Sequence, residues 1–263
     1  MPPALTRTRT PAIVLAYHGL GRFPRELDPY NLMLDPARLR AQVRSLRRRG
    51  YSFVRLSQLA GWIDGRPPRA VCALTFDDGT LDNLTLLAPL LRELRLPATV
   101  FACPGILGEP HFAMPPAAGV RLMDAGELQQ LSRFEQIEIG SHTVAHTDLS
   151  RADGEQALAD MSESKRMLEE LLQREVGAFA YPKCDYSRAC PQAAESAGYE
   201  LAVTCAGRGG WKRFELARES IAAIDGRLTF ELKSRKLFDP LRASSAGRLA
   251  TRALRPLRHR SAA

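Results

Sequence analysis

Ala70-Val-Cys-Ala-Leu-Thr-Phe-Asp-Asp-Gly79 is an apolar segment that ends in two adjacent aspartates and a glycine. Its uncharged first part predicts a buried strand of the kind found in parallel sheets. The two carboxylates at the strand tip are costly to bury unless a cation or a proton compensates them. Neighbouring side chains point different ways, so one acid can bind a metal while the other stays free as a base. A pair of capping or turn aspartates is the alternative.

Apolar strands alternate with amphipathic helices on both sides of this stretch. Further strands are predicted at 12–17, 52–56, 98–102, 137–140, 178–181, 201–204 and 220–224. Helices are predicted to start after Asp35, at Ser57, at 84, with a kink or late start at Pro89, after Asp124, with the segment 150–153, at 191 and at 228. About seven such units predict an α/β fold in which parallel strands close into a barrel. Catalytic groups then belong at the carboxyl ends of the strands.

Length and composition fit one soluble domain. The chain has 263 residues, of which 45% are hydrophobic and 25% charged. We predict an N-terminal tail at 1–11, the barrel at 12–240 and a basic tail at 241–263. The start has no apolar stretch typical of a secretory signal, and the five cysteines are odd in number with no C-x-x-C pair. We therefore expect a cytoplasmic protein without a disulfide framework.

Much of the positive charge is local. Lysine and arginine exceed aspartate and glutamate by 37 − 29 = 8, with arginines crowded at 44–49 and 248–260. A solvated helix face and a tail explain this excess, and peripheral contact of the tail with the anionic inner membrane surface is a further expectation. Arginines without interleaved aromatics are a weak nucleic-acid signature, so no nucleic-acid partner is expected.

A second motif, Ser141-His-Thr-Val-Ala-His146, also follows a strand end. Two histidines four residues apart share one face of a helical turn, a spacing suited to one metal. Alone the motif is weak, and unrelated core or surface histidines are the alternative. Combined with Asp78, it gives two imidazoles and one carboxylate with positions left open, which is typical of a catalytic metal site.

Taken together, these motifs resemble the polysaccharide deacetylase family, also called carbohydrate esterase family 4 or the NodB-homology family. AYHG at 16–19 is similar to the opening of the subgroup acting on poly-N-acetylglucosamine. The resemblance covers roughly 12–235 and rests on TFDDG (75–79), LPATVFA (96–102), EIGSH (138–142), SHTVAH (141–146) and FAYP (179–182).

The resemblance implies a single distorted, TIM-like (β/α)7 barrel and a hydrolase of carbon–nitrogen bonds other than peptide bonds. Its substrate would be an amino-sugar saccharide, either a polysaccharide or a lipid- or nucleotide-linked precursor, from which it releases acetate. Asp78, His142 and His146 would hold a divalent metal, most often zinc. That metal would lower the pKa of its bound water and polarise the acetamide carbonyl.

The remaining roles at the site belong to a base, an oxyanion donor and a general acid. The resemblance implies Asp77 as general base and the Tyr181 backbone N–H as an oxyanion donor, with Pro182 lining the site. The late histidine that often serves as general acid is missing, since the only histidine after His146 lies in the basic tail. We hypothesise that His18, at the end of the first strand, replaces it. A histidine hydrogen-bonded in the barrel mouth is the alternative.

Four more residues are interpreted with alternatives. Arg218 precedes the predicted last strand, where the resemblance implies an arginine that orients Asp77; an ordinary surface arginine is the alternative. Trp211 stacks on a sugar ring, or is a core or lid tryptophan. His111, in the proline-rich loop 104–116, belongs to a substrate-side lid rather than to a metal site. Cys184 stands where the family usually has glycine, which indicates a different loop turn.

Two other functions stay open at this stage. The same scaffold serves deacylases of small, non-polysaccharide amides. A non-catalytic carbohydrate- or nucleic-acid-binding barrel is the second rival, prompted by the missing acid. Asp77 argues against lost catalysis, because binding a metal does not require it.

Overall fold

The structure, a computed structural model, describes residues 12–65, 67–206 and 208–238. The chain divides into two compact units, Met1–Ala223 and Ile224–Ala263. The first holds every strand and helices α1 to α6, and the second holds helix α7 (Arg227–Ser234). The tails at 1–11 and 241–263 lie outside the described residues, so the domain boundaries and the membrane contact stay predictions. No described helix combines the length and apolar character needed to cross a membrane.

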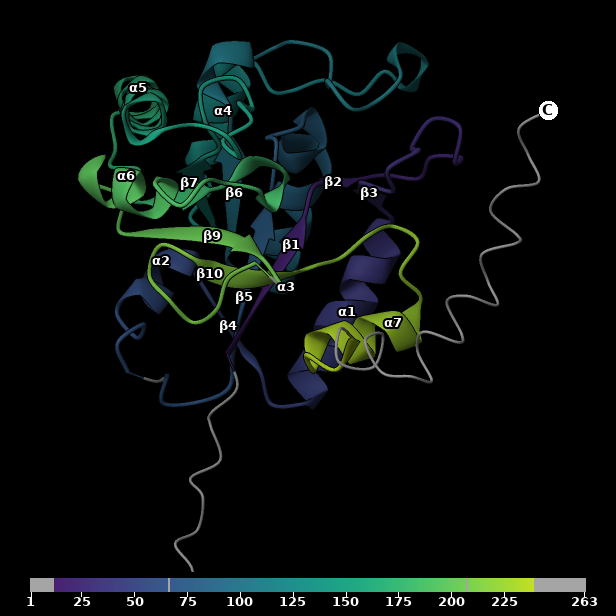
Figure 1. Ribbon diagram of the computed structural model, residues 1–263. Coiled ribbons are helices and arrows are strands. Elements are labelled where there is room, and N and C mark those ends of the chain that lie inside the picture. Colours follow the sequence, from purple (N-terminus) through teal and green to yellow (C-terminus); the bar gives the residue numbers. More distant parts are fainter. Residues whose placement is uncertain (1–11, 66, 207, 239–263) are drawn as a thin grey trace, which may run out of the picture. The chain divides into compact units, whose positions relative to one another are not determined.

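Seven parallel strands form a closed ring, which confirms the predicted barrel (Figure 1). Strand β5 pairs back with β1 from Ala12↔Val71 to Tyr17↔Phe76, and this pairing closes the ring. The order around the ring is β1 (Ala12–Tyr17), β10 (Leu216–Ser220), β9 (Leu201–Cys205), β8 (Ala178–Ala180), β7 (Ile137–Ser141), β6 (Ala98–Ala102) and β5 (Val71–Phe76).

The ring is distorted beside β5. A short strand, β4 (Ser52–Val54), pairs with the first half of β5, whereas β6 pairs only with its last two residues. A separate pair of two-residue strands, β2 (Gly19–Leu20) and β3 (Met33–Leu34), follows the end of β1 and was not predicted. The barrel is therefore irregular between β5 and β6, whereas the pairing of β5 with β1 is continuous.

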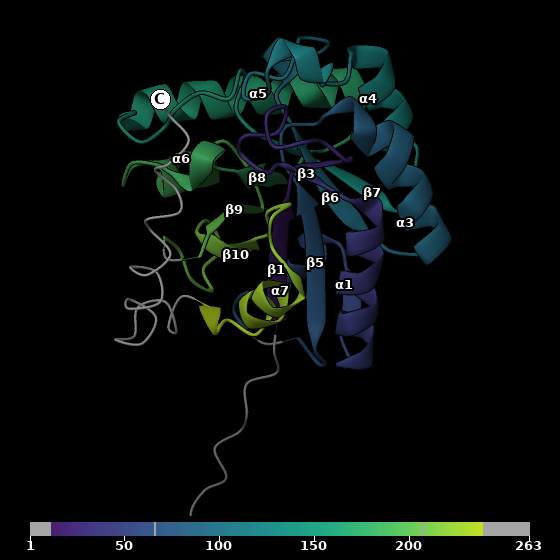
Figure 2. The ribbon, with the colours of Figure 1, turned by 90° about the vertical axis from the view of Figure 1, so that its right-hand side faces the viewer.

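Helices α1 to α6 lie outside the strands (Figures 1 and 2). The predicted caps Asp35 and Asp124 are confirmed, since Asp35 accepts the Ala37 N–H and Asp124 forms a capping box. Helix α5, predicted to open with 150–153, begins after the last of these residues, Asp153, which forms its capping box. The helix interrupted by Pro89 begins late, as predicted, after a π-helical turn. The bounds are α1 (Pro36–Arg48), α2 (Leu56–Ala60), η1 (Asn83–Leu87), α3 (Ala88–Leu94), η2 (Pro104–Ile106), η3 (Pro116–Ala118), α4 (Ala125–Ser132), α5 (Gly154–Leu172), η4 (Pro182–Cys184) and α6 (Cys190–Ser196).

The barrel interior is an apolar core that changes to polar at the carboxyl ends of the strands. Val71 and Ala73 pack with residues from the other strands and with helix α2. Because side chains alternate along a strand, the same inward series continues through Thr75 to Asp77. The strand that fills the core therefore also carries the first acid to the mouth of the barrel.

The predicted position of the last strand, 220–224, is wrong. Strand β10 spans Leu216–Ser220, so Arg218 lies within the strand rather than before it. A buried arginine is unusual in a strand. Its charge is compensated by Asp77, a partner from a strand that is distant in sequence.

Candidate active site

The Asp-Asp-Gly segment turns sharply at the end of β5. The Asp77 N–H still donates to the Tyr17 carbonyl at 2.9 Å, whereas Asp78 and Gly79 have φ values of 71° and 72°. This left-handed conformation is uncommon for aspartate and favours glycine at the second position. A Cβ at Gly79 would also lie 3.3 Å from the Ala102 Cβ. The turn sends the two carboxylates to different partners.

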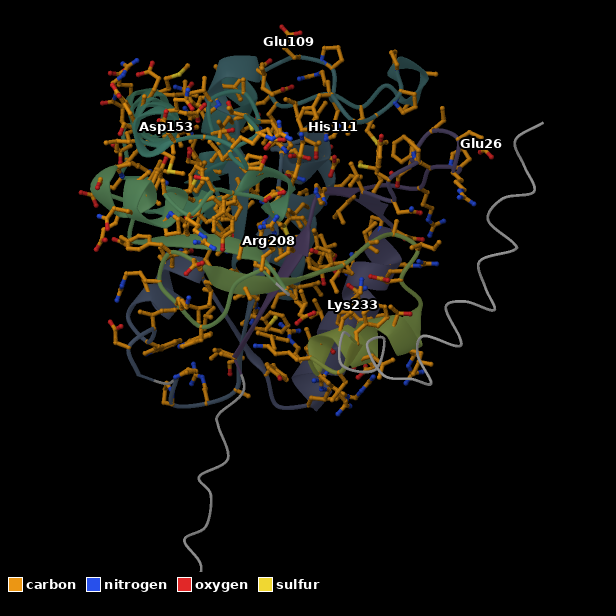
Figure 3. The ribbon with its side chains drawn as sticks, viewed as in Figure 1. Glu26, Glu109, His111, Asp153, Arg208 and Lys233 are labelled. Atoms are coloured by element: carbon orange, nitrogen blue, oxygen red, sulfur yellow. A yellow bond between two sulfur atoms is a disulfide. The ribbon has the colours of Figure 1, made fainter. Side chains whose placement is uncertain are left out.

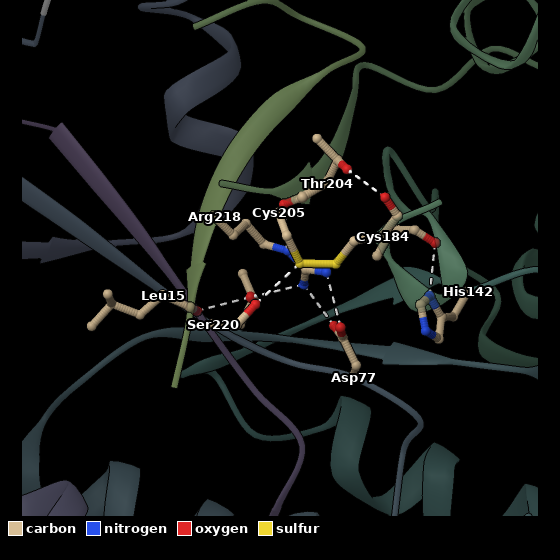
Figure 4. Close-up of a disulfide and its surroundings, with 10 residues drawn as sticks. Leu15, Asp77, His142, Cys184, Thr204, Cys205, Arg218 and Ser220 are labelled. Atoms are coloured by element: carbon tan, nitrogen blue, oxygen red, sulfur yellow. Dashed lines mark hydrogen bonds and ion pairs between the residues drawn. A yellow bond between two sulfur atoms is a disulfide. The ribbon is translucent and has the colours of Figure 1, made fainter. Parts of the chain in front are cut away.

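Asp77 forms a bidentate ion pair with Arg218 inside the barrel (Figure 4). Arg218 Nη1 lies 2.6 Å from Asp77 Oδ1 and Nη2 lies 2.9 Å from Oδ2, while the guanidinium also donates to Thr75 Oγ1 and Thr204 O. Burial favours the neutral acid, but the Arg218 charge and hydrogen bonds, helped by nearby histidines, hold the pKa of Asp77 below its usual value. The structure thus places Arg218 where it can orient Asp77.

Asp78, His142 and His146 converge on one point. Asp78 Oδ1 lies 3.6 Å from His142 Nε2 and 3.7 Å from His146 Nε2, and the three ligand atoms lie within 4.8 Å of one another. Tetrahedral bonds of 2.0–2.1 Å would set ligand atoms about 3.3–3.4 Å apart. Asp78 Oδ1 is also buried without a hydrogen-bond partner among the described residues, which is costly unless a cation faces it. This donor set fits a divalent metal such as zinc.

The two histidines are not on a helical turn, as the sequence predicted. The segment after β7 turns with left-handed φ values of 66° at Thr143 and 57° at His146. Asp160 on α5 stabilises this turn by accepting hydrogen bonds from the Val144 N–H at 3.0 Å and the Thr147 hydroxyl at 2.7 Å. The spacing of the two histidines had suggested a helical turn held by backbone hydrogen bonds. The Asp160 side chain, from a neighbouring helix, holds the turn instead.

Both imidazoles have the state that metal binding needs. His142 Nδ1–H donates to the Ala180 carbonyl at 2.7 Å, which leaves the lone pair of Nε2 facing Asp78. Burial and the nearby His142 lower the pKa of His146 to about 4, so this ring is neutral at neutral pH. Neutral imidazoles are the form that binds zinc.

His111 is the residue that sequence reasoning misplaced. Rather than lying in a lid, it is buried, with Nε2 3.1 Å from Asp78 Oδ2 (Figure 3). The loop that carries it is held by the bridges Pro110↔Arg121 and Thr80↔Leu122. Its proline content suggested a surface segment, and no sequence periodicity marks where such a loop returns to the core. The only available signal was that the chain has just five histidines.

His18 follows strand β1 at the same mouth. Its backbone carbonyl accepts a hydrogen bond from Asn83 Nδ2 at 3.2 Å. Its charge, when the ring is protonated, acts on both Asp77 and Asp78 and favours their ionised forms. The structure therefore places His18 near the two acids. It follows β1, which pairs with β5 on one side and with the last strand, β10, on the other.

The structure gives the surroundings of the three residues predicted to contact substrate, Tyr181, Pro182 and Trp211. The Tyr181 N–H donates to Val203 O at 3.1 Å and its hydroxyl to Phe214 O at 2.9 Å, so sheet pairing and burial already use both groups. The predicted oxyanion role of this N–H therefore needs correction. Pro182 is buried, and Trp211 packs against the hydrophobic core cluster, in line with the core alternative.

Cys184 and Cys205 form a disulfide, which contradicts the expectation of free thiols (Figure 4). The two Cα atoms lie 5.4 Å apart because Cys184 lies in η4, shortly after β8, and Cys205 ends the neighbouring strand β9. The spacing of 21 residues concealed this adjacency. Cys184 also has a left-handed φ of 57°, the conformation for which the glycine usual at this position is suited.

Comparison with known proteins agrees with this geometry. The family profile for polysaccharide deacetylase matches residues 64–202, more than half of the chain. The chain belongs to the polysaccharide deacetylase family. YxkH of Bacillus subtilis (strain 168), which carries the name of a polysaccharide deacetylase, is 24% identical over 205 residues, 76% of this chain and 67% of that protein.

Solved structures share the fold. The deacetylase PplD of Streptococcus pyogenes, determined in complex with acetate, has a TM-score of 0.71 at 23% identity over 86% of this chain and 99% of its own. IcaB from Ammonifex degensii has a TM-score of 0.71 at 18% identity over 87% and 97%. The predicted NodB-type (β/α)7 barrel is thus confirmed, as is the class of hydrolases acting on carbon–nitrogen bonds other than peptide bonds. Polysaccharide deacetylases of this family de-N-acetylate saccharides and are generally metal-dependent.

Proposed function

We propose that this polysaccharide deacetylase is a zinc-dependent enzyme that removes N-acetyl groups from an amino-sugar saccharide. The observation that carries the proposal is the convergence of Asp78, His142 and His146, with a second acid, Asp77, outside the ligand set. A bound zinc ion supplies Lewis-acid chemistry, acidifying a water molecule and polarising the acetamide carbonyl.

Asp77 is the general base in this proposal. Its carboxylate is ionised at neutral pH and stands next to the metal ligand Asp78. It takes one proton from the water molecule as the water oxygen bonds to the acetyl carbon. Arg218 holds the carboxylate by both oxygens and so fixes the direction from which the proton is accepted.

His18 is the proposed general acid. A protonated imidazole delivers its proton to the sugar nitrogen as the carbon–nitrogen bond breaks, which releases a free amine and acetate. Its position at the end of β1, beside the end of β5, allows acid and base to act on one substrate. In this proposal His18 takes the place of the late histidine that the sequence lacks.

Asp77→Asn tests the base. We expect this variant to bind zinc as wild type does and to lose at least about 10²-fold in acetate release from N-acetylglucosamine oligomers, because the amide cannot accept the proton. Metal content by mass spectrometry and acetate release by a coupled assay are the two measurements. His142→Ala is the control that loses zinc as well as turnover. An Asp77→Asn enzyme with wild-type turnover would contradict the proposal.

A further inference from the structure

The two oxygens of Asp78 have different surroundings. Oδ1 faces the two imidazole Nε2 atoms and has no hydrogen-bond partner among the described residues. Oδ2 lies on the other side, 3.1 Å from His111 Nε2. One oxygen is therefore directed at the metal point while the other is held by protein.

The backbone fixes which nitrogen of His111 carries the proton. The Ala113 N–H donates to His111 Nδ1 at 3.1 Å, and a nitrogen that accepts a hydrogen bond has no proton. The neutral ring must then carry its proton on Nε2, where it points at Asp78 Oδ2. His111 is thus a neutral donor to a metal-binding carboxylate rather than a ligand competing for the metal.

His111 is also held in place before any ion binds. Its N–H donates to the Val120 carbonyl at 3.0 Å, and its carbonyl accepts the Met114 N–H at 3.1 Å. The half-exposed Phe112 ring stacks on it at 4.6 Å between centroids and packs on the His146 ring at 4.2 Å. The donor is therefore already positioned with respect to the ligand set.

We propose that His111 is a positioning residue for the metal centre: it holds Asp78 Oδ2 so that only Oδ1 is offered to the metal, and it thereby sets the metal affinity. The inference rests on the metal site of the proposed function. Hydrogen-bonded partners of metal-binding carboxylates stabilise the binding orientation, and removing one typically costs about 10–100-fold in metal affinity or activity.

The test is zinc affinity of the full chain, measured by competition with a chromophoric chelator. We expect His111→Leu to bind zinc about 10–100-fold more weakly. His111→Gln should recover most of the affinity, because its amide nitrogen reaches the position of Nε2 and donates the same hydrogen bond. Glu109→Gln, in the same loop but exposed, is the matched control and should bind as wild type.

Thermal unfolding of the metal-free variants shows whether the fold is kept. Equal zinc affinity in His111→Leu and wild type would overturn the inference, and so would equally weak binding by the glutamine and leucine variants. Zinc binding by wild type that His142→Ala leaves unchanged would instead remove the metal site itself, and with it the proposed function. The two failures are thus distinguishable.

Discussion

At the scale of single residues, the site depends on the turn after β5, which directs Asp77 to Arg218 and Asp78 to the two imidazoles. Asp77, Asp78, His142 and His146 were predictable from the sequence because charged and ligating groups directly after apolar strands meet at one end of a barrel. His111 was misplaced because its position depends on a loop returning to Asp78 over a path that no periodicity encodes. The Tyr181 N–H was misassigned because a neighbouring strand uses it.

Arg218→Gln should move the acid limb of the kcat/KM profile to higher pH. Burial favours protonated Asp77 and the Arg218 charge opposes it, so removing that charge lets the pKa of Asp77 rise. A base with a raised pKa stays protonated, and inactive, up to a higher pH, and the expected shift is about 1–3 units. Initial rates of acetate release across the acid and neutral range measure it. Arg218→Lys keeps the charge and should shift less, whereas an unmoved limb in Arg218→Gln would contradict the electrostatic role.

His18→Gln should lower acetamide turnover by about 10²-fold while zinc affinity stays unchanged. The loss should depend on the leaving group, because an acid is needed only where the departing atom must gain a proton. Hydrolysis of 4-nitrophenyl acetate, whose leaving group departs as a stable anion, should therefore be largely retained. Asp77→Asn should lose both reactions. Equal losses of the two substrates in His18→Gln would exclude the acid role.

At the scale of elements, strands and caps were predictable where the pattern is local. The caps of α1, α4 and α5 and the late start of α3 follow from side chains within one turn. The last strand was predicted too far along the chain, because Arg218 and Glu219 are charged and a buried strand is not expected there. Only the structure shows that Asp77, distant in sequence, is the partner of Arg218 in β10. The segment at His142 was predicted as a helical turn for a similar reason, because the hydrogen bond that stabilises its actual turn comes from Asp160 on another element.

The disulfide between Cys184 and Cys205 should contribute measurably to stability. Cross-linking Cys184 to Cys205, 21 residues apart, stabilises a fold by about 3 kcal/mol in the chain-entropy account. A reducing agent should then lower the Tm of wild type by about 6–12 °C. The double variant Cys184→Ser, Cys205→Ser should start at the lower Tm and not respond to the reductant. A wild-type Tm that is insensitive to reduction would contradict this expectation.

At the scale of the whole molecule, the barrel was predictable because alternating units have few ways to bury strands on both faces. The pairing of β2 with β3 was not, since two-residue strands carry no usable pattern, whereas the short strand β4 was predicted at 52–56. The disulfide was not predictable either, because the adjacency of β8 and β9 arises only after the ring has closed.

Zinc should stabilise the whole fold by binding the native state alone. At a free concentration about 100-fold above Kd the gain is about 2.7 kcal/mol, which raises the Tm by about 5–11 °C. Calorimetry of the chelator-treated chain, with and without added zinc, measures the shift. His142→Ala should show little or none, and an equal shift in that variant would mean that the ion binds elsewhere.

The closure of the ring by β1 and β5 fixes the spacing of His18 and Asp77. Because a ladder of backbone hydrogen bonds links these strands up to the residues preceding His18 and Asp77, the spacing of the two groups is a property of the frame. The segment at 21–32 is not part of that ladder. Substitutions in it should therefore leave the separation of the proposed acid and base unchanged.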